Sequence, residues 1–166
     1  MGEGLGRMVY ISRFCYNTQT WEIAASEIGI TEVRCRNTFL HAKENEISRQ
    51  AAQQLQAYWN GTLTRFQVPL DLSGTDFQKL VWKALLEIPY GSSVCYSELA
   101  CRIGRPEAVR AVAGAVGKNP CLIIVPCHRV LGKDGSLTGF SAGLEIKKQL
   151  LNLEHIPYID KKNRSK

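Results

Sequence analysis

A cysteine and a histidine stand side by side at residues 123–130, whose sequence is IIVPCHRV. A cysteine thiolate is a strong nucleophile, and histidine moves protons readily near neutral pH. Neighbouring side chains on a regular strand point to opposite faces, so Cys127 and His128 can act together only if the chain bends at Pro126. The segment therefore predicts a reactive thiol at the end of a buried strand, and the neighbouring elements must position it.

Activation of Cys127 requires a base or a positive charge nearby, and a histidine and an arginine follow it directly. A histidine used in this way is usually oriented by a carboxylate on its other ring nitrogen. The helix predicted for residues 143–155 offers Glu154 near its end and Glu145 near its start. Either carboxylate could complete a Cys–His–Glu arrangement.

The surrounding elements predict an α+β chain. Residues 8–36 contain short β-prone pieces between turn residues, which is typical of a small antiparallel sheet. Periodicity and capping residues predict helices at 44–61, 75–88, 98–103, 106–116 and 143–155, and an apolar run predicts a strand at 121–125. The short helices on either side of Gly104 have the layout of a helix-turn-helix. A domain boundary is expected near residue 74.

Capping and burial can be predicted for several of these helices. Thr75 and Gln78 form a capping box, and Ser97 and Pro106 are expected to begin the next two helices. The predicted inward-facing residues are Ile47, Ala51, Leu55, Tyr58, Phe77, Leu80, Val81, Leu85, Leu144, Ile146, Leu150 and Leu153.

The positive charge lies in the second half of the chain. The sequence up to Gly74 has 7 Lys and Arg against 7 Asp and Glu, whereas the sequence from Thr75 has 14 against 8, which accounts for the net charge of +6. A polyanion such as nucleic acid is one partner that this predicts. A solvated surface with a basic end, DKKNRSK, explains the same counts, so charge alone leaves both interpretations open.

The six cysteines include no C-x-x-C pair. Since no signal-peptide core and no bilayer-length apolar run is visible, we expect reduced thiols in an intracellular chain. The cysteines other than Cys127 are expected to be small buried hydrophobic residues: Cys15, Cys35, Cys95, Cys101 and Cys121. Cys15, Cys35 and His41 lack ligand spacing and a fourth partner, so no metal is expected. No cofactor motif is visible either.

Residues 75–154 resemble the methylated-DNA–protein-cysteine methyltransferases, also called O⁶-alkylguanine-DNA alkyltransferases. The matching segments are FQKLVWKALLEIPYG, AVRAVAGAVGKNP, IIVPCHRV, GSLTGFSAG and KKQLLNLE, in this order over about half of the chain. The N-terminal half matches only in layout. The resemblance implies a ribonuclease-H-like α/β domain at 1–74, followed at 75–166 by a mostly helical domain with a winged helix-turn-helix.

The resemblance also implies what the chain does. It implies a repair protein, monomeric and without a cofactor, that binds the minor groove of double-stranded DNA in the cytoplasm, or in the nucleus of a eukaryote. Cys127 would take the alkyl group from O⁶ of guanine permanently, with a water-bridged proton relay through His128 to Glu154. The damaged base must be flipped out, because its O⁶ atom cannot reach a protein thiol inside the duplex.

Further roles carry over from the matched motifs. Tyr96 in CYSEL would help to protonate the departing guanine and also contact the DNA. Arg110 in AVRAV would fill the gap left by the flipped base, and its small neighbours, including Ala111, would let the helix enter the groove. Asn119 in GKNP would brace the active-site turn. In the pocket, Ser141 would lie beside the guanine oxygen, and the carbonyl of Val130 would hold the guanine amino group.

The sequence departs from the family pattern at three places. Cys95 stands where serine or threonine is common, Ala113 where glycine is usual, and Phe140, in the substrate pocket, where tyrosine is commoner. These departures bear on the shape of the pocket and the range of substrates.

Three other classes of protein remain as alternatives. The alkyltransferase-like binders carry tryptophan where this chain has Cys127, and the adaptive-response regulators need four cysteines where the first half has only Cys15 and Cys35. A cysteine hydrolase would leave the helix-turn-helix and Arg110 without a role. Incubation with DNA that carries a labelled methyl group on guanine O⁶ distinguishes all three from the enzyme.

Overall fold

The computed structural model describes residues 8–161 and divides into two compact units. The first unit consists of the chain up to Ser73 together with Pro120–Ile124. The second unit consists of Gly74–Asn119 and the chain from Val125 onward. The Cys-His pair belongs to the second unit, and the five residues Pro120–Ile124 just before it belong to the first.

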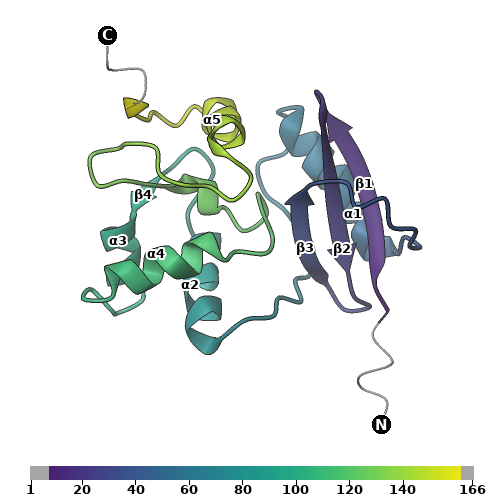
Figure 1. Ribbon diagram of the computed structural model, residues 1–166, viewed down its shortest axis with the longest axis horizontal. Helices are drawn as coiled ribbons and strands as arrows, with labels where there is room; N and C mark the ends of the chain where they lie inside the picture. Colours follow the sequence, from purple (N-terminus) through teal and green to yellow (C-terminus); the bar gives the residue numbers. More distant parts are fainter. Residues whose placement is uncertain (1–7, 162–166) are drawn as a thin grey trace. The chain divides into compact units, whose positions relative to one another are not determined.

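An antiparallel sheet forms the centre of the first unit, as the sequence predicted. Its strands β1 (Tyr10–Tyr16), β2 (Gln19–Ala25) and β3 (Ile30–Cys35) pair in the order β1-β2-β3. Helix α1 (Glu46–Trp59) lies along one face of this sheet (Figure 1). The core between them is formed by buried strand residues and the inner side of α1, including Trp21, Ile23, Ile30, Val33, Ala51, Leu55 and Tyr58.

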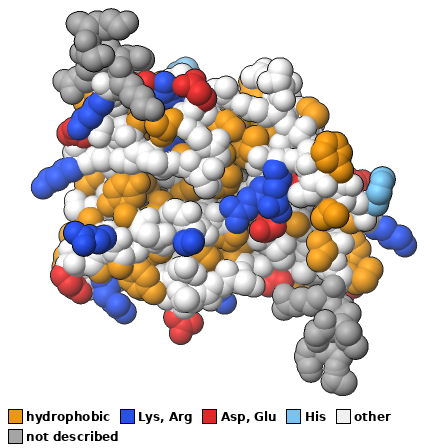
Figure 2. Space-filling model, in the orientation of Figure 1, with side chains coloured by type: hydrophobic (Ala, Val, Ile, Leu, Met, Phe, Trp, Pro, Cys, Tyr) orange, Lys and Arg blue, Asp and Glu red, His pale blue; other side chains and the backbone are white. Residues whose placement is uncertain are grey.

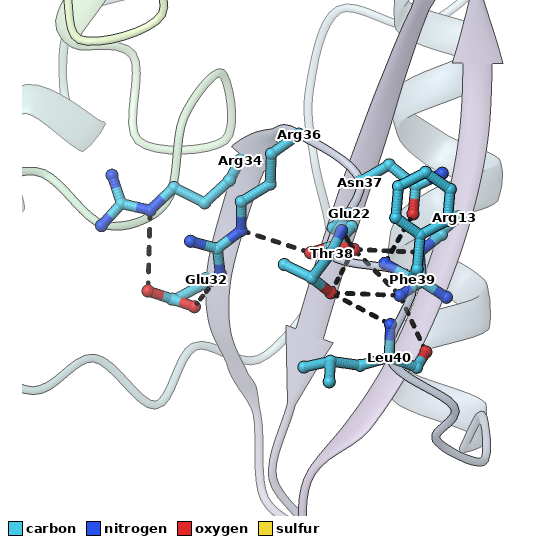
Figure 3. Close-up of polar contacts among 9 residues, drawn as sticks. All are labelled: Arg13, Glu22, Glu32, Arg34, Arg36, Asn37, Thr38, Phe39 and Leu40. Carbon is cyan, nitrogen blue, oxygen red and sulfur yellow. Dashed lines mark hydrogen bonds and ion pairs between the residues drawn. The ribbon is translucent and has the colours of Figure 1, made fainter.

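The first unit also holds a buried carboxylate. Glu22 on β2 accepts hydrogen bonds from the backbone N–H of Thr38 at 2.6 Å, the Thr38 hydroxyl at 2.8 Å and Arg13 Nε at 3.0 Å. Arg36 Nε donates to its other oxygen at 3.2 Å (Figure 3). Burial alone would raise the pKa of Glu22, but these hydrogen bonds outweigh it and hold the pKa below its ordinary value.

Helices are the main regular structure of the second unit. They are α2 (Asp76–Leu86), α3 (Tyr96–Arg102), α4 (Val109–Gly117) and α5 (Leu144–Leu153). The capping box predicted for α2 is confirmed, because Thr75 and Gln78 each bond the other's backbone N–H at 3.0 Å. The prediction of the apolar face of α2 was partly wrong, because Leu80 is exposed. Trp82 is buried instead, and its indole N–H donates to the carbonyl of Ala115 on α4.

Two predicted helix starts were wrong. Helix α3 begins at Tyr96 rather than after Ser97, because Cys95 is the N-cap residue and its N–H donates to the Glu98 carboxylate at 2.8 Å. Helix α4 begins at Val109 rather than Pro106, because the chain first makes a turn in which the Ala108 N–H bonds the Arg105 carbonyl. Proline is common at the first helical position, but here Pro106 lies in the turn that precedes the helix.

The strand predicted at residues 121–125 does not form. Cys121 makes a single bridge with Val33, closed by Val33 N–H to Pro120 O at 3.0 Å and Leu122 N–H to Val33 O at 3.1 Å. Ile123 then takes a φ of +72°, which a β-branched residue rarely adopts and which a strand cannot contain. The apolar run of this segment therefore comes from burial in a turn.

A second, very small sheet supports the start of α3. Strand β4 (Val94–Cys95) pairs in parallel with β5 (Val130–Leu131). The chain between the turn and β5 is the short 3-10 helix η1 (Cys127–Arg129). This pairing ties the residues after Cys127 to the residues before Tyr96.

The other cysteines differ from the expectation. Only Cys121 among them is buried, since Cys15 and Cys101 are exposed and Cys35 and Cys95 are intermediate. No disulfide joins the six, and across residues 8–161 no group of His, Cys, Asp or Glu is arranged to hold a metal ion. None of the helices described between Met8 and Lys161 is both long and apolar enough to cross a membrane.

Candidate active site

Cys127 lines a pocket in the second unit. The chain bends at Pro126, as the sequence predicted, since the Cys127 N–H bonds the Val125 carbonyl at 2.8 Å across it. The pocket has a volume of about 280 Å³, near the lower end of the range for small-molecule sites. Its lining residues are Tyr96, Ala113, Val116, Gly117, Cys127, Gly139, Phe140 and Ser141. The thiol is 6% exposed, so a reacting group must enter the pocket to reach it.

Asn119 fixes the turn before the cysteine. Its side chain is fully buried and donates to the carbonyl of Val125 at 2.8 Å. The same carbonyl accepts the Cys127 N–H, so one oxygen holds both sides of the bend. A buried amide with this partner restricts where the thiol can lie.

Behind the thiol, His128 meets Glu154. Nε2 of His128 lies 2.8 Å from Oε2 of Glu154, and both side chains are buried. The other carboxylate considered from the sequence, Glu145, is 84% exposed on α5 and pairs with Lys148 at 3.2 Å. Of the two candidates, the structure brings only Glu154 to the histidine.

The histidine is held in its neutral form. Burial lowers the pKa of His128 and outweighs the opposite effect of Glu154, while Arg129 and Lys147 lower it further. An ionised carboxylate only accepts hydrogen bonds, so Nε2 carries the hydrogen that faces Glu154. Nδ1 is then the nitrogen with the lone pair, and it is the atom able to accept a proton from a thiol.

Arg129 completes this cluster, in a role that the sequence analysis did not predict. The sequence suggested a positive neighbour for Cys127, but the guanidinium turns to Glu154, with Nε to Oε1 at 2.8 Å and Nη2 to Oε2 at 3.0 Å. Its third contact is Nη1 to the carbonyl of Ile88 at 2.7 Å. A two-point contact of this kind fixes the position of the Glu154 carboxylate and favours its ionised form.

Tyr96 and Thr138 meet at the pocket wall. The hydroxyl of Tyr96, at the first residue of α3, lies 2.8 Å from Oγ1 of Thr138. Burial raises the pKa of Tyr96, the bond with Thr138 opposes this, and the charge of Cys127 raises it further. The phenol therefore stays protonated and can donate a proton.

Lys147 is a buried cation that the sequence analysis missed. Its ammonium donates to the carbonyl of Val130 at 2.9 Å, to the carbonyl of Thr138 at 3.2 Å and to the Thr138 hydroxyl at 3.0 Å. The helical spacing could have predicted its burial, because Lys147 lies three residues before Leu150 on the inward side of α5. The carbonyl of Val130, expected to face guanine, thus already accepts one hydrogen bond from the protein.

The outer face of α4 is small and open. Arg110 and Ala111 are exposed, and so are Gly114 and Gly117, where an added Cβ would meet nothing within 4 Å. The buried side of α4 consists of Val112, Ala115 and Val116. The small residues on the outer face therefore do not serve core packing, and they leave the backbone of α4 accessible to a partner.

Comparisons with known proteins agree on one family. Residues 76–156 match the family model described as 6-O-methylguanine DNA methyltransferase, DNA binding domain. A methylated-DNA–protein-cysteine methyltransferase of Methanosarcina barkeri is 58% identical over 106 residues, which cover 64% of this chain and 67% of the relative. The Haemophilus influenzae protein of the same name is 60% identical over 105 residues, which cover 63% of this chain and 59% of the relative.

Solved structures extend the similarity over nearly the whole chain. The crystal structure of the Mycobacterium tuberculosis O⁶-methylguanine methyltransferase superimposes with a TM-score of 0.80 at 42% identity, covering 94% of this chain and 99% of the other. The M. tuberculosis OGT in complex with DNA gives a TM-score of 0.77 at 43% identity, with 89% and 92% covered. Both share the mixed α/β architecture described above.

Proposed function

The chain belongs to the methylated-DNA–protein-cysteine methyltransferase family, and we propose that it repairs DNA by moving the alkyl group of O⁶-alkylguanine onto its own Cys127. The observation that carries the proposal is the buried cluster behind the thiol: Cys127 faces a pocket while His128 contacts Glu154 at 2.8 Å. Each molecule reacts once, because a thioether has no good leaving group and no second cysteine lines the pocket among the described residues. No cofactor takes part.

Activation of the thiol begins at His128. Nδ1 of the neutral imidazole takes the proton of Cys127 through a bridging water, and Glu154 stabilises the imidazolium that forms. Arg129 keeps the carboxylate ionised and oriented during this step. The thiolate sulfur then attacks the alkyl carbon, and the bond from that carbon to O⁶ of guanine breaks.

The departing guanine needs a proton, and Tyr96 supplies it from the pocket wall. The walls of the pocket come from residues 139–141 and from α4, so Phe140, Ser141 and Ala113 set its shape. Ser141 lies beside the guanine oxygen, and the second lone pair of the Val130 carbonyl accepts from the guanine amino group.

The DNA-binding element is a winged helix-turn-helix formed by α3 and α4. Its second helix enters the minor groove with the open face of Ala111 and Gly114, and Arg110 occupies the gap left by the flipped base. Replacement Arg110→Ala is expected to slow repair in duplex DNA much more than reaction with free O⁶-alkylguanine, since only the duplex has a gap to fill. Equal losses on both substrates would contradict this role.

The first half of the chain forms the ribonuclease-H-like domain at residues 1–74, and residues 75–166 form the DNA-binding and alkyl-acceptor domain, except that Pro120–Ile124 belong to the first compact unit. The three-stranded sheet with α1 on one face supports the first assignment. The protein acts as a monomer on double-stranded DNA. It therefore works where the DNA is, in the cytoplasm of a prokaryote or the nucleus of a eukaryote.

Titration against excess DNA that carries O⁶-methylguanine tests the proposal. Mass spectrometry is expected to show one added methylene per protein, located on Cys127, and product is expected to stop at one equivalent. Replacement Cys127→Ser is expected to abolish transfer and to leave DNA binding intact. Binding without transfer by the unaltered protein would point to a non-catalytic binder, and product beyond one equivalent would contradict the single turnover.

A further inference from the structure

The ammonium of Lys147 is unusual because it donates three hydrogen bonds and each acceptor is an uncharged oxygen. It is 1% exposed, and its partners are the carbonyls of Val130 and Thr138 and the Thr138 hydroxyl. Between Met8 and Lys161, no carboxylate is paired with it. A buried ammonium without a paired carboxylate is costly, so its presence near the reactive thiol points to a role in the reaction.

Two hydrogen bonds link Lys147 to Tyr96 through the hydroxyl of Thr138, and the donors in this chain follow one order. An ammonium can only donate, so Oγ1 of Thr138 accepts from Nζ at 3.0 Å. The Thr138 hydroxyl hydrogen is then available for Tyr96, whose oxygen lies 2.8 Å from Oγ1. When Thr138 donates to Tyr96, the phenol hydrogen of Tyr96 is directed toward a further acceptor. Each member of this chain is oriented by the one before it.

We propose that Lys147 is the source of the proton that the departing guanine receives, and that the hydroxyl of Thr138 carries it to Tyr96. This inference rests on the proposed function, in which Tyr96 protonates guanine. It assigns Thr138 and Lys147 to the reaction as a second proton relay, separate from the one through His128 and Glu154.

The steps balance in atoms and charge. The Cys127 thiolate forms a bond to the alkyl carbon, and the electron pair of the broken C–O bond leaves on guanine. Guanine takes the Tyr96 proton, Tyr96 takes the Thr138 proton, and Thr138 takes one proton from the Lys147 ammonium. A thiolate and an ammonium thus become a neutral thioether and a neutral amine, and the amine recovers its proton from solvent afterwards.

The electrostatics of the site favour this transfer at the right moment. Burial lowers the pKa of Lys147 to about 8, and the charge of Cys127 acts in the opposite direction by favouring the ammonium. Alkylation removes the charge of the sulfur, so the ammonium loses that support when guanine needs a proton. A donor whose pKa lies near the working pH is also the efficient kind of general acid.

A comparison of two methyl donors separates the relay from other roles of Thr138. O⁶-methylguanine in duplex DNA has a leaving group that must be protonated, whereas methyl iodide releases iodide, which needs no proton. Replacement Thr138→Val removes the hydroxyl, and Thr138→Ser retains it as the matched control. Methylation is followed at Cys127 by peptide mass spectrometry, because Cys15 and Cys101 are exposed and will also react.

We expect Thr138→Val to slow transfer from O⁶-methylguanine about 10- to 100-fold, while the rate with methyl iodide stays within about twofold. Thr138→Ser is expected to retain most of the rate with both donors. Equal slowing with both donors, or no slowing with O⁶-methylguanine, would overturn the relay. An unaltered protein that reacts with methyl iodide but never with O⁶-methylguanine would instead contradict the proposed function itself.

Lys147→Met gives an independent test, with Lys148→Met on the same helix as its control. The neighbouring Lys148 pairs with Glu145 and Asp160. We expect Lys147→Met to slow transfer from O⁶-methylguanine, and Lys148→Met to leave it unchanged. Members of one relay are not additive, so the double variant with Thr138→Val should be little slower than the slower single variant. Fully additive losses would show that Lys147 and Thr138 act separately.

Discussion

At the scale of single residues, the site depends on where a few charges are buried. Glu154 accepts from His128 and Arg129, and a backbone N–H, that of Gly91, donates to its Oε1 at 3.0 Å. One carboxylate therefore positions the histidine and balances the arginine. Removal of Glu154 or of Arg129 would leave the other charge buried without compensation, which is costly.

Glu154→Gln is expected to slow alkyl transfer while DNA affinity changes little. A neutral amide stabilises the imidazolium of His128 poorly, and the loss of one relay member costs on the order of 10²–10⁴-fold in rate. Single-turnover kinetics measure the rate, and a gel-shift titration measures DNA affinity. The control is Glu145→Gln on the exposed side of α5. A folded Glu154→Gln variant with the normal rate would rule out this carboxylate.

The acid stability of the protein should depend on Glu22. Its pKa is held below the ordinary 4.5, so its ionised form stabilises the fold above that pH, and the contribution is lost as the pH falls through the folded-state value. Glu22→Gln should lower the free energy of unfolding at pH 7 by about 1–2 kcal/mol. It should also weaken the pH dependence below 4.5.

Urea unfolding at several pH values measures both effects of Glu22→Gln. Glu32→Gln is a suitable control, because the Glu32 side chain is 36% exposed and its ion pairs lie nearer to solvent. Unfolding curves of Glu22→Gln that fall with acid as steeply as those of the unaltered protein would contradict the assignment.

At the scale of elements, α4 combines a packed side with an open one. Its buried residues fix it to α2 and α3, and the outer side carries glycines that packing does not require. Glycine lowers helix stability by about 0.5–1 kcal/mol relative to alanine, so its retention on an open face fits a surface that a partner must approach closely.

Gly114 offers the sharpest test of this face. Both Gly114→Ala and Gly114→Gln should raise the melting temperature, because each is a better helix former and a Cβ there has open space. Only the long glutamine side chain should obstruct a narrow groove, so DNA affinity should fall clearly in Gly114→Gln and little in Gly114→Ala. Fluorescence anisotropy with a duplex measures affinity. Equal affinity in both variants would place the DNA elsewhere.

At the scale of the whole molecule, the excess positive charge belongs to the second half of the chain. On the face seen in Figure 2, lysine and arginine side chains are spread between hydrophobic and uncharged groups. At the end of β3, Arg34 and Arg36 both pair with Glu32 (Figure 3). Part of the basic surface is therefore internally neutralised.

DNA binding is expected to weaken with salt and to show little preference for undamaged sequence. Phosphate contacts release counterions, so the logarithm of the binding constant should fall linearly with the logarithm of the salt concentration. The expected slope is about −0.9 for each phosphate contacted. A repair protein must also scan any sequence. Anisotropy titrations of several undamaged duplexes over a range of salt test both statements. A flat salt response, or strong preference for one duplex, would contradict them.

Some features of this protein could be predicted from its sequence, because they depend on neighbouring residues. The capping box of Thr75 and Gln78, the bend at Pro126 and the helical periodicity of α1 and α5 are local, and each formed close to the expected position. Short-range hydrogen bonds and the fixed φ of proline do not require the rest of the fold.

Other features were decided only by the tertiary structure. The choice of Glu154 over Glu145, the turn of Arg129 toward that carboxylate and the burial of Lys147 depend on which helix faces packed inward. The strand expected at 121–125 was lost for a similar reason: an apolar run shows burial, but only one pair of hydrogen bonds to β3 formed before Ile123 turned the chain. Long-range packing selects among partners that local sequence makes equally available.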